Sequence, residues 1–164
     1  MNFFEFYRYE DAIKLATDPT FDQVKFDYYL ETKGSSDHSK LIEMLEKLND
    51  ESQPMEKLLK TYFDVENISY WMAFQLLTGN ADTQSRNVYL YSPQNSSVWY
   101  LLDWDNDGML RRKERELIRF TDSESWERGI SNYWCNVLFR RCLQTASYRE
   151  ALDTAVRELH DYLN

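Results

Sequence analysis

Glycine, proline and cysteine are scarce in this chain of 164 residues, with four, three and two copies respectively. Four scattered glycines cannot form the glycine-rich loop with which many nucleotide-binding proteins hold phosphates. Cys135 and Cys142 lie seven residues apart in a helical pattern, roughly 10 Å apart on one helix, which is too far for a disulfide between them. No Cys-x-x-Cys metal motif occurs, so both residues are predicted to be buried thiols.

Long apolar runs and basic clusters are scarce as well. No stretch approaches the roughly 20 apolar residues of a membrane span, and the N-terminal sequence MNFFEFYRYED lacks the regions of a signal peptide. The net charge is −9, and the densest basic segment, Arg111–Arg115, is interrupted by Glu114. We therefore expect no membrane span and no nucleic-acid partner, and a cation is the more natural ligand for this surface.

The chain is rich in apolar residues (43%) and aromatic residues (16%), which at this length favours one packed domain over residues 1–164. Asp64 is a predicted N-cap and Gly79 a predicted left-handed C-cap for a central, buried helix over 65–78. A capping box, Ser147 to Glu150, is predicted to open the last helix. Helices are predicted over 9–17, 20–32, 37–48, 54–62, 65–78, 123–143 and 148–162, and a β-hairpin over 88–91 and 98–102. The predicted fold class is mostly α with one β-hairpin.

The first candidate site precedes the hairpin. Asp82 and Asn87 lie five residues apart, shortly after the glycine that ends the central helix. This Asp-x4-Asn spacing is typical of phosphotransfer loops, in which the Asp orients the attacking hydroxyl and the Asn binds a metal ion. The alternative is ordinary turn chemistry, in which both side chains bind nearby backbone amides.

The second candidate site follows the hairpin, where Asp103, Asp105 and Asp107 are closely spaced. Carboxylates at this spacing repel one another and favour a hard cation such as Mg²⁺ or Ca²⁺. In one interpretation, the hairpin returns one of them to Asn87, and both bind Mg²⁺ or Mn²⁺ together with the phosphates of ATP. A solvated acidic turn is the simplest alternative.

A calcium loop is the other interpretation of this second site. The pattern D-x-D-x-D-G-x5-E runs from Asp103 to Glu114, through Asp105 and Asp107. A predicted strand enters this loop where an EF-hand has a helix, and three basic residues lie within it. The protein would then be a non-catalytic interaction module stabilised by Ca²⁺.

Three segments resemble the CotH family, the spore coat protein H-type atypical protein kinases: Tyr70–Asp82, Arg86–Tyr91 and Trp104–Asp107. The family pattern is an apolar helix, a loop Asp, an Asn that opens a Tyr-x-Tyr strand, and Trp-Asp-x-Asp after the second strand. Phe63–Asn67 and the closing pair of helices also resemble the family. The resemblance implies a protein-kinase-like C-lobe.

The same resemblance implies residue roles. Asp82 would be the catalytic Asp, Asn87 and Asp105 would bind the nucleotide-associated Mg²⁺ or Mn²⁺, and Asp107 would be a further ligand. The implied reaction transfers phosphate from ATP to Ser or Thr of a coat or secreted protein. The implied location is the spore coat, the cell surface or the exterior of the cell.

Two features depart from the family pattern. Asp103 stands where the family often has Pro. The first 30 residues contain no strand pair to cover the phosphates and no strand Lys with a partner Glu. We therefore expect this chain to be a C-terminal lobe whose N-lobe belongs to a longer parent chain.

Overall fold

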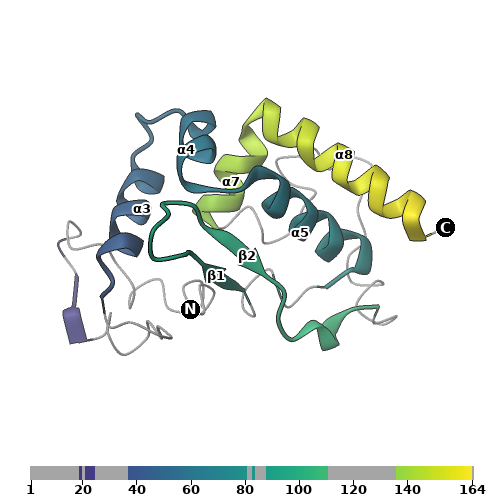
Figure 1. The fold of residues 1–164 in the computed structure, drawn as a ribbon, viewed down its shortest axis with the longest axis horizontal. Helices are drawn as coiled ribbons and strands as arrows, with labels where there is room; N and C mark the ends of the chain where they lie inside the picture. Colours follow the sequence, from purple (N-terminus) through teal and green to yellow (C-terminus); the bar gives the residue numbers. More distant parts are fainter. Residues whose placement is uncertain are drawn as a thin grey trace.

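The computed structural model describes residues 19, 21–24, 37–80, 83, 88–110 and 136–163. Within these ranges the chain is mostly helical with one antiparallel hairpin, as predicted (Figure 1). The helix predicted over 9–17 and most of that over 20–32 lie outside the described residues. The elements are α3 (Ser39–Asn49), α4 (Met55–Tyr62), α5 (Val65–Thr78), β1 (Tyr89–Tyr91), β2 (Tyr100–Leu102), the 3-10 helix η2 (Asn106–Gly108), α7 (Val137–Gln144) and α8 (Ala146–Leu163).

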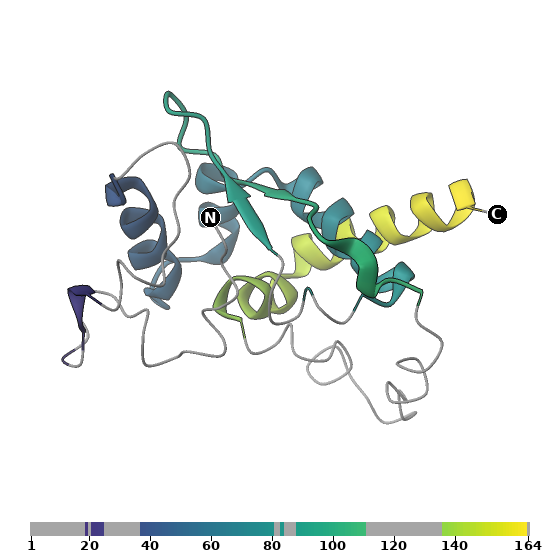
Figure 2. The ribbon, with the colours of Figure 1, turned by 90° about the horizontal axis from the view of Figure 1, so that it is seen from below.

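Helix α5 is central, with α8 packed along one side and the hairpin on another (Figures 1 and 2). Its predicted caps are confirmed. The Asp64 carboxylate accepts a hydrogen bond from the Asn67 amide at 2.9 Å, and Gly79 adopts the left-handed conformation with φ of 64°. Glycine reaches this region without the steric cost of a Cβ, so the helix ends abruptly. Residues 80 onward therefore start from a rigid, buried support.

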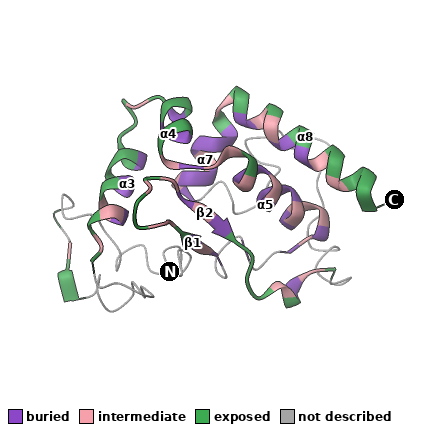
Figure 3. Cartoon of the chain, viewed as in Figure 1, coloured by how far each residue is buried: buried purple, intermediate pink, exposed green. Residues whose placement is uncertain are grey.

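The hairpin pairs Tyr89 with Leu102, Leu90 with Leu101 and Tyr91 with Tyr100. Because side chains alternate across a strand, Leu90 and Leu101 face the core while Tyr91 and Leu102 are exposed. The buried faces of α3, α4, α5, α7 and α8 and the inner face of the hairpin form one core, and the outer faces of α3, α4 and α8 meet solvent (Figure 3). No helix in the described part of the chain has the length and apolarity needed to cross a bilayer.

Two predictions for the C-terminal helices are wrong. The helix predicted over 123–143 is not continuous, because Asn136 is extended (ψ of 128°) and caps α7 by accepting from the Leu138 amide at 2.9 Å. The capping box is also wrong, because α8 begins at Ala146, directly after the extended Thr145 that ends α7. Ser147 lies inside α8, and its hydroxyl donates to the Glu56 carboxylate at 3.3 Å.

Cys142 is a buried thiol, as predicted, with no exposed surface. Burial raises the pKa of this thiol because it disfavours the charged thiolate. Cys135 lies outside the described residues, and the extended Asn136 prevents α7 from continuing unbroken toward it. The expectation that both cysteines share one helix is therefore wrong.

Candidate functional site

The acidic segment 103–110 begins directly after β2, which ends at Leu102. The side chains of Asp103, Asp105 and Asp107 are exposed. Asp105 adopts a left-handed conformation (φ of 52°), after which Asn106–Gly108 form a 3-10 turn. A strand therefore enters this segment, as the sequence indicates, and the turn presents Asp105 and Asp107 on the surface.

Hydrogen bonds fasten this segment to the C-terminal end of α5. The Leu110 amide donates to the Thr78 carbonyl at 2.8 Å, and the Asn80 side-chain amide donates to the Asn106 side-chain oxygen at 3.1 Å. Asn80 is buried and lies two residues before Asp82 in the chain. The segment after the hairpin is thus held against the residues that open the Asp-x4-Asn loop.

The Gln75 side chain hydrogen-bonds both to the acidic segment, at Asp103, and to Asn80. Its side-chain nitrogen donates to the Asp103 carboxylate at 2.8 Å, and its side-chain oxygen accepts from the Asn80 amide at 2.9 Å. Gln75 is 1% exposed, and its hydrogen bond with Asn80 is buried, whereas its hydrogen bond with the exposed Asp103 is partly buried. Partial burial raises the pKa of Asp103, while the hydrogen bond from Gln75 acts in the opposite direction.

Sequence reasoning did not identify Gln75 or Asn80 as site residues. The signal was present, because Gln75 is an amide within an otherwise apolar helix and a buried amide needs hydrogen-bond partners. Its partner Asp103 lies 28 residues away, however, so only the tertiary fold reveals the pair.

Asp82, Asn87 and Glu114 lie outside the described residues, so their roles stay predictions. Two of their sequence neighbours, Thr83 and Val88, are described, and both are buried. Thr83 is buried and its hydroxyl donates to the Asn80 carbonyl at 3.0 Å, and Val88 is fully buried before β1. Thr83 is thus engaged as a structural hydroxyl.

The donor chemistry of this segment suits a hard cation. Asp105 and Asp107 offer carboxylate oxygens, the ligands that Mg²⁺ and Mn²⁺ accept in proteins. Within the described residues, no three Asp, Glu, His or Cys side chains gather into a metal site. A complete site would therefore need further donors, and Asn87 is the predicted one.

The backbone of the segment differs from that of an EF-hand loop. Such a loop turns sharply at its sixth residue, which is here Gly108. Gly108 instead belongs to a 3-10 turn, and among residues 88–110 the positive φ angles occur at Asp105 and Leu110. The predicted calcium ligands Asp103, Asp105 and Asp107 are present, and the fourth, Glu114, lies outside the described residues.

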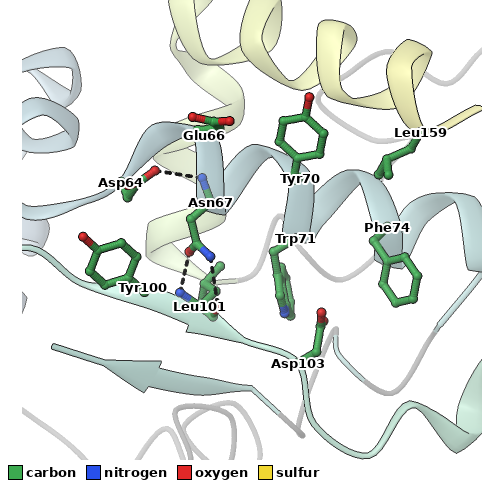
Figure 4. Close-up of a pocket in the computed structure, with 10 residues that line it drawn as sticks. All are labelled: Asp64, Glu66, Asn67, Tyr70, Trp71, Phe74, Tyr100, Leu101, Asp103 and Leu159. Atoms are coloured by element: carbon green, nitrogen blue, oxygen red, sulfur yellow. Dashed lines mark hydrogen bonds between the residues drawn. The ribbon is translucent and has the colours of Figure 1, made fainter. Parts of the chain in front are cut away.

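An open groove runs beside α5 and reaches the acidic segment at Asp103 (Figure 4). Its volume is about 560 Å³, and it combines carboxylate with aromatic side chains. The lining residues are Asp64, Glu66, Asn67, Tyr70, Trp71, Phe74, Tyr100, Leu101, Asp103 and Leu159. A second groove, between α5 and α8, shares Glu66 and Tyr70 with the first.

Comparison with protein families agrees with the resemblance noted in the sequence. The family model described as CotH kinase protein matches residues 3–164. The chain therefore belongs to the CotH kinase family. No curated protein and no solved structure matches the chain.

Proposed function

We propose that this chain is the C-terminal, kinase-like lobe of a protein kinase that transfers phosphate from ATP to Ser or Thr of a protein substrate. The observation that carries the proposal is the hydrogen bond between Asn80 and Asn106. It joins the residues before Asp82 to the turn that contains Asp105 and Asp107. Phosphotransfer requires such proximity, because the Asp that orients the hydroxyl and the metal-binding carboxylates act on one phosphate.

The proposed roles follow from the side-chain chemistry. Asp82 accepts a hydrogen bond from the attacking hydroxyl and takes up its proton as transfer proceeds. Asn87, Asp105 and Asp107 supply oxygen ligands for Mg²⁺ or Mn²⁺, which when bound with ATP neutralises phosphate charge. Gln75 and Asn80 position the segment that carries these ligands. The acceptor is a coat or secreted protein by analogy with the family.

The lobe assignment is part of the proposal. Helix α5 ends shortly before the Asp-x4-Asn motif in the sequence, and the hairpin returns the second acidic segment to the end of α5 at Thr78 and Asn80, an arrangement that suits the lower lobe of a kinase. The cover over the ATP phosphates would come from an N-lobe in a longer parent chain.

Ligand-dependent thermal stability tests the proposal, because a ligand that binds the folded state raises the unfolding midpoint. The midpoint is measured with Mg²⁺, Mn²⁺, Ca²⁺ or EDTA, each with and without ATP, for this chain and for its longest natural form. We expect an increase that requires ATP together with Mg²⁺ or Mn²⁺. Asp105→Ala should remove the increase, whereas Asp153→Ala, at an exposed aspartate on α8, should keep it.

Two results would overturn the proposal. An increase with Ca²⁺ that is indifferent to ATP, and that Glu114→Ala removes, would assign the acidic segment to a calcium loop. The absence of any increase in the longest form would show that the protein does not bind a metal–nucleotide complex.

A further inference from the structure

We infer that Trp104 is a positioning residue for the proposed metal–nucleotide site, and that it acts through its aromatic contact with Tyr89. The two rings meet edge to face, with their centroids 5.2 Å apart and an angle of 66° between their planes. Trp104 directly precedes Asp105, and Tyr89 follows Asn87 by two residues. The contact therefore joins the chain beside one predicted metal ligand to the chain beside another. This role rests on the proposed function, because that proposal supplies the two ligands.

The contact lies just past the end of the hydrogen-bonded ladder between β1 and β2. Tyr89 and Leu102 are the residue pair at that end of the ladder. Trp104 lies two residues after Leu102, and its ring reaches Tyr89 in the diagonal manner of neighbours on one face of a hairpin. The aromatic pair thus extends the connection between the two chain segments beyond the ladder, in the direction of Asn87 and Asp105.

The exposure of Trp104 favours a local role over a role in the core. Trp104 is 57% exposed and does not belong to the buried core. It contributes little to global stability, because most of its apolar surface stays in water. Its contact with Tyr89 instead fixes the direction in which the chain leaves β2. The backbone turns immediately afterwards, since Asp105 is left-handed with φ of 52°, so a rotation at Trp104 would move the carboxylate of Asp105.

The hydrogen bonds of Gln75 and Asn80 hold the same segment from a different direction. Both attach it to the C-terminal end of α5, whereas the contact of Trp104 attaches it to β1. Asn87 lies on the β1 side, two residues before that strand. Trp104 therefore sets the separation between Asp105 and Asn87. Because Mg²⁺ requires nearly ideal ligand geometry, a loosely held pair of ligands binds it less tightly.

Binding of a metal–nucleotide complex tests this role without any phosphate transfer. The longest natural form of the protein is titrated in a calorimeter with Mn²⁺ premixed with a non-hydrolysable ATP analogue. We expect Trp104→Leu to weaken binding about threefold to tenfold, which corresponds to the loss of one aromatic pair. Trp104→Phe keeps an aromatic ring against Tyr89, and its affinity should stay within about twofold of the wild type.

A double-variant cycle assigns the effect to the pair of rings. Tyr89→Leu should weaken binding as much as Trp104→Leu, and the double variant should bind no more weakly than either, because each single change already removes the contact. Tyr91→Leu is the matched control and should bind as the wild type does, since the exposed Tyr91 contacts Tyr100 at the opposite end of the ladder. The unfolding midpoint of Trp104→Leu without ligand should stay close to that of the wild type.

Wild-type affinity in Trp104→Leu would overturn the positioning role and leave the proposed function standing. Losses of affinity that add up in the double variant would also overturn it, because the two rings would then act separately. So would an unfolding midpoint of Trp104→Leu far below that of the wild type, since Trp104 would then be a structural residue. A wild type that does not bind the metal–nucleotide complex would overturn the proposed function, and the role of Trp104 with it.

Discussion

The side chain of Asn67 pairs with the backbone of Leu101 in both directions. Its nitrogen donates to the Leu101 carbonyl at 3.1 Å, and its oxygen accepts from the Leu101 amide at 2.7 Å (Figure 4). The amide group thus occupies the place of a further strand at the free edge of β2. Because β2 leads directly into the acidic segment, Asn67 fixes that segment relative to α5.

Asn67→Leu should therefore lower the free energy of unfolding by about 1–3 kcal/mol, because it leaves buried backbone groups of Leu101 without partners. Urea denaturation measures the change. Asn95→Leu, at an exposed position of the hairpin turn, is the control and should change stability by about 0.5 kcal/mol or less. Similar losses in both variants would contradict the role of Asn67.

Gln75→Glu should destabilise the protein by roughly 2–4 kcal/mol, because it places a buried carboxylate against that of Asp103. Adding Asp103→Asn should restore part of the loss, since the carboxylate at position 75 then faces an amide. Thermal or urea unfolding of the single and double variants measures the coupling. The control, Gln144→Glu, alters an exposed residue of α7 and should have little effect. If the double variant is as unstable as Gln75→Glu alone, repulsion between positions 75 and 103 is not the cause of the destabilisation.

Arg141 fastens α7 to the connection between α3 and α4. Arg141 is 8% exposed, and its guanidinium donates to the carbonyls of Leu48, in the last turn of α3, and of Asp50 and Gln53 in the connection. Arg141→Lys should cost about 1.5–3 kcal/mol of unfolding free energy, because an ammonium group cannot reproduce the fork of donors. Calorimetry with Arg157→Lys as control tests this, since the side chain of Arg157 is 75% exposed and pairs with Asp153 on the surface. Equal losses of unfolding free energy in Arg141→Lys and Arg157→Lys would contradict the role given to Arg141.

Elements with strong local signals could be predicted from the sequence. Asp64 and Gly79 set the ends of α5, and the aromatic and β-branched segments on either side of a turn gave the hairpin. The break at Asn136 could not be predicted from apolar periodicity, because the pattern continues through a residue whose side chain caps the next helix. A capping interaction there outweighs a repeating pattern.

The candidate site could be predicted in part. The β-branched and aromatic segment 98–102 indicated that Asp103 follows a strand, which the structure confirms. The contacts of Gln75, Asn80 and Asn106 could not be predicted, since each connects residues distant in sequence or depends on a loop conformation. Asp82, Asn87 and Glu114 lie outside the described residues and stay predictions.

Phosphate transfer by the longest natural form of the protein tests the central claim most directly. Incorporation of radiolabelled phosphate from ATP into protein Ser or Thr is measured with Mg²⁺ or Mn²⁺ for the wild type, Asp82→Ala, and Asp153→Ala as control. We predict incorporation by the wild type and the control, and a loss of at least about 100-fold in Asp82→Ala, because general-base positioning contributes about that much. Equal incorporation by the wild type and Asp82→Ala would contradict the proposed kinase site.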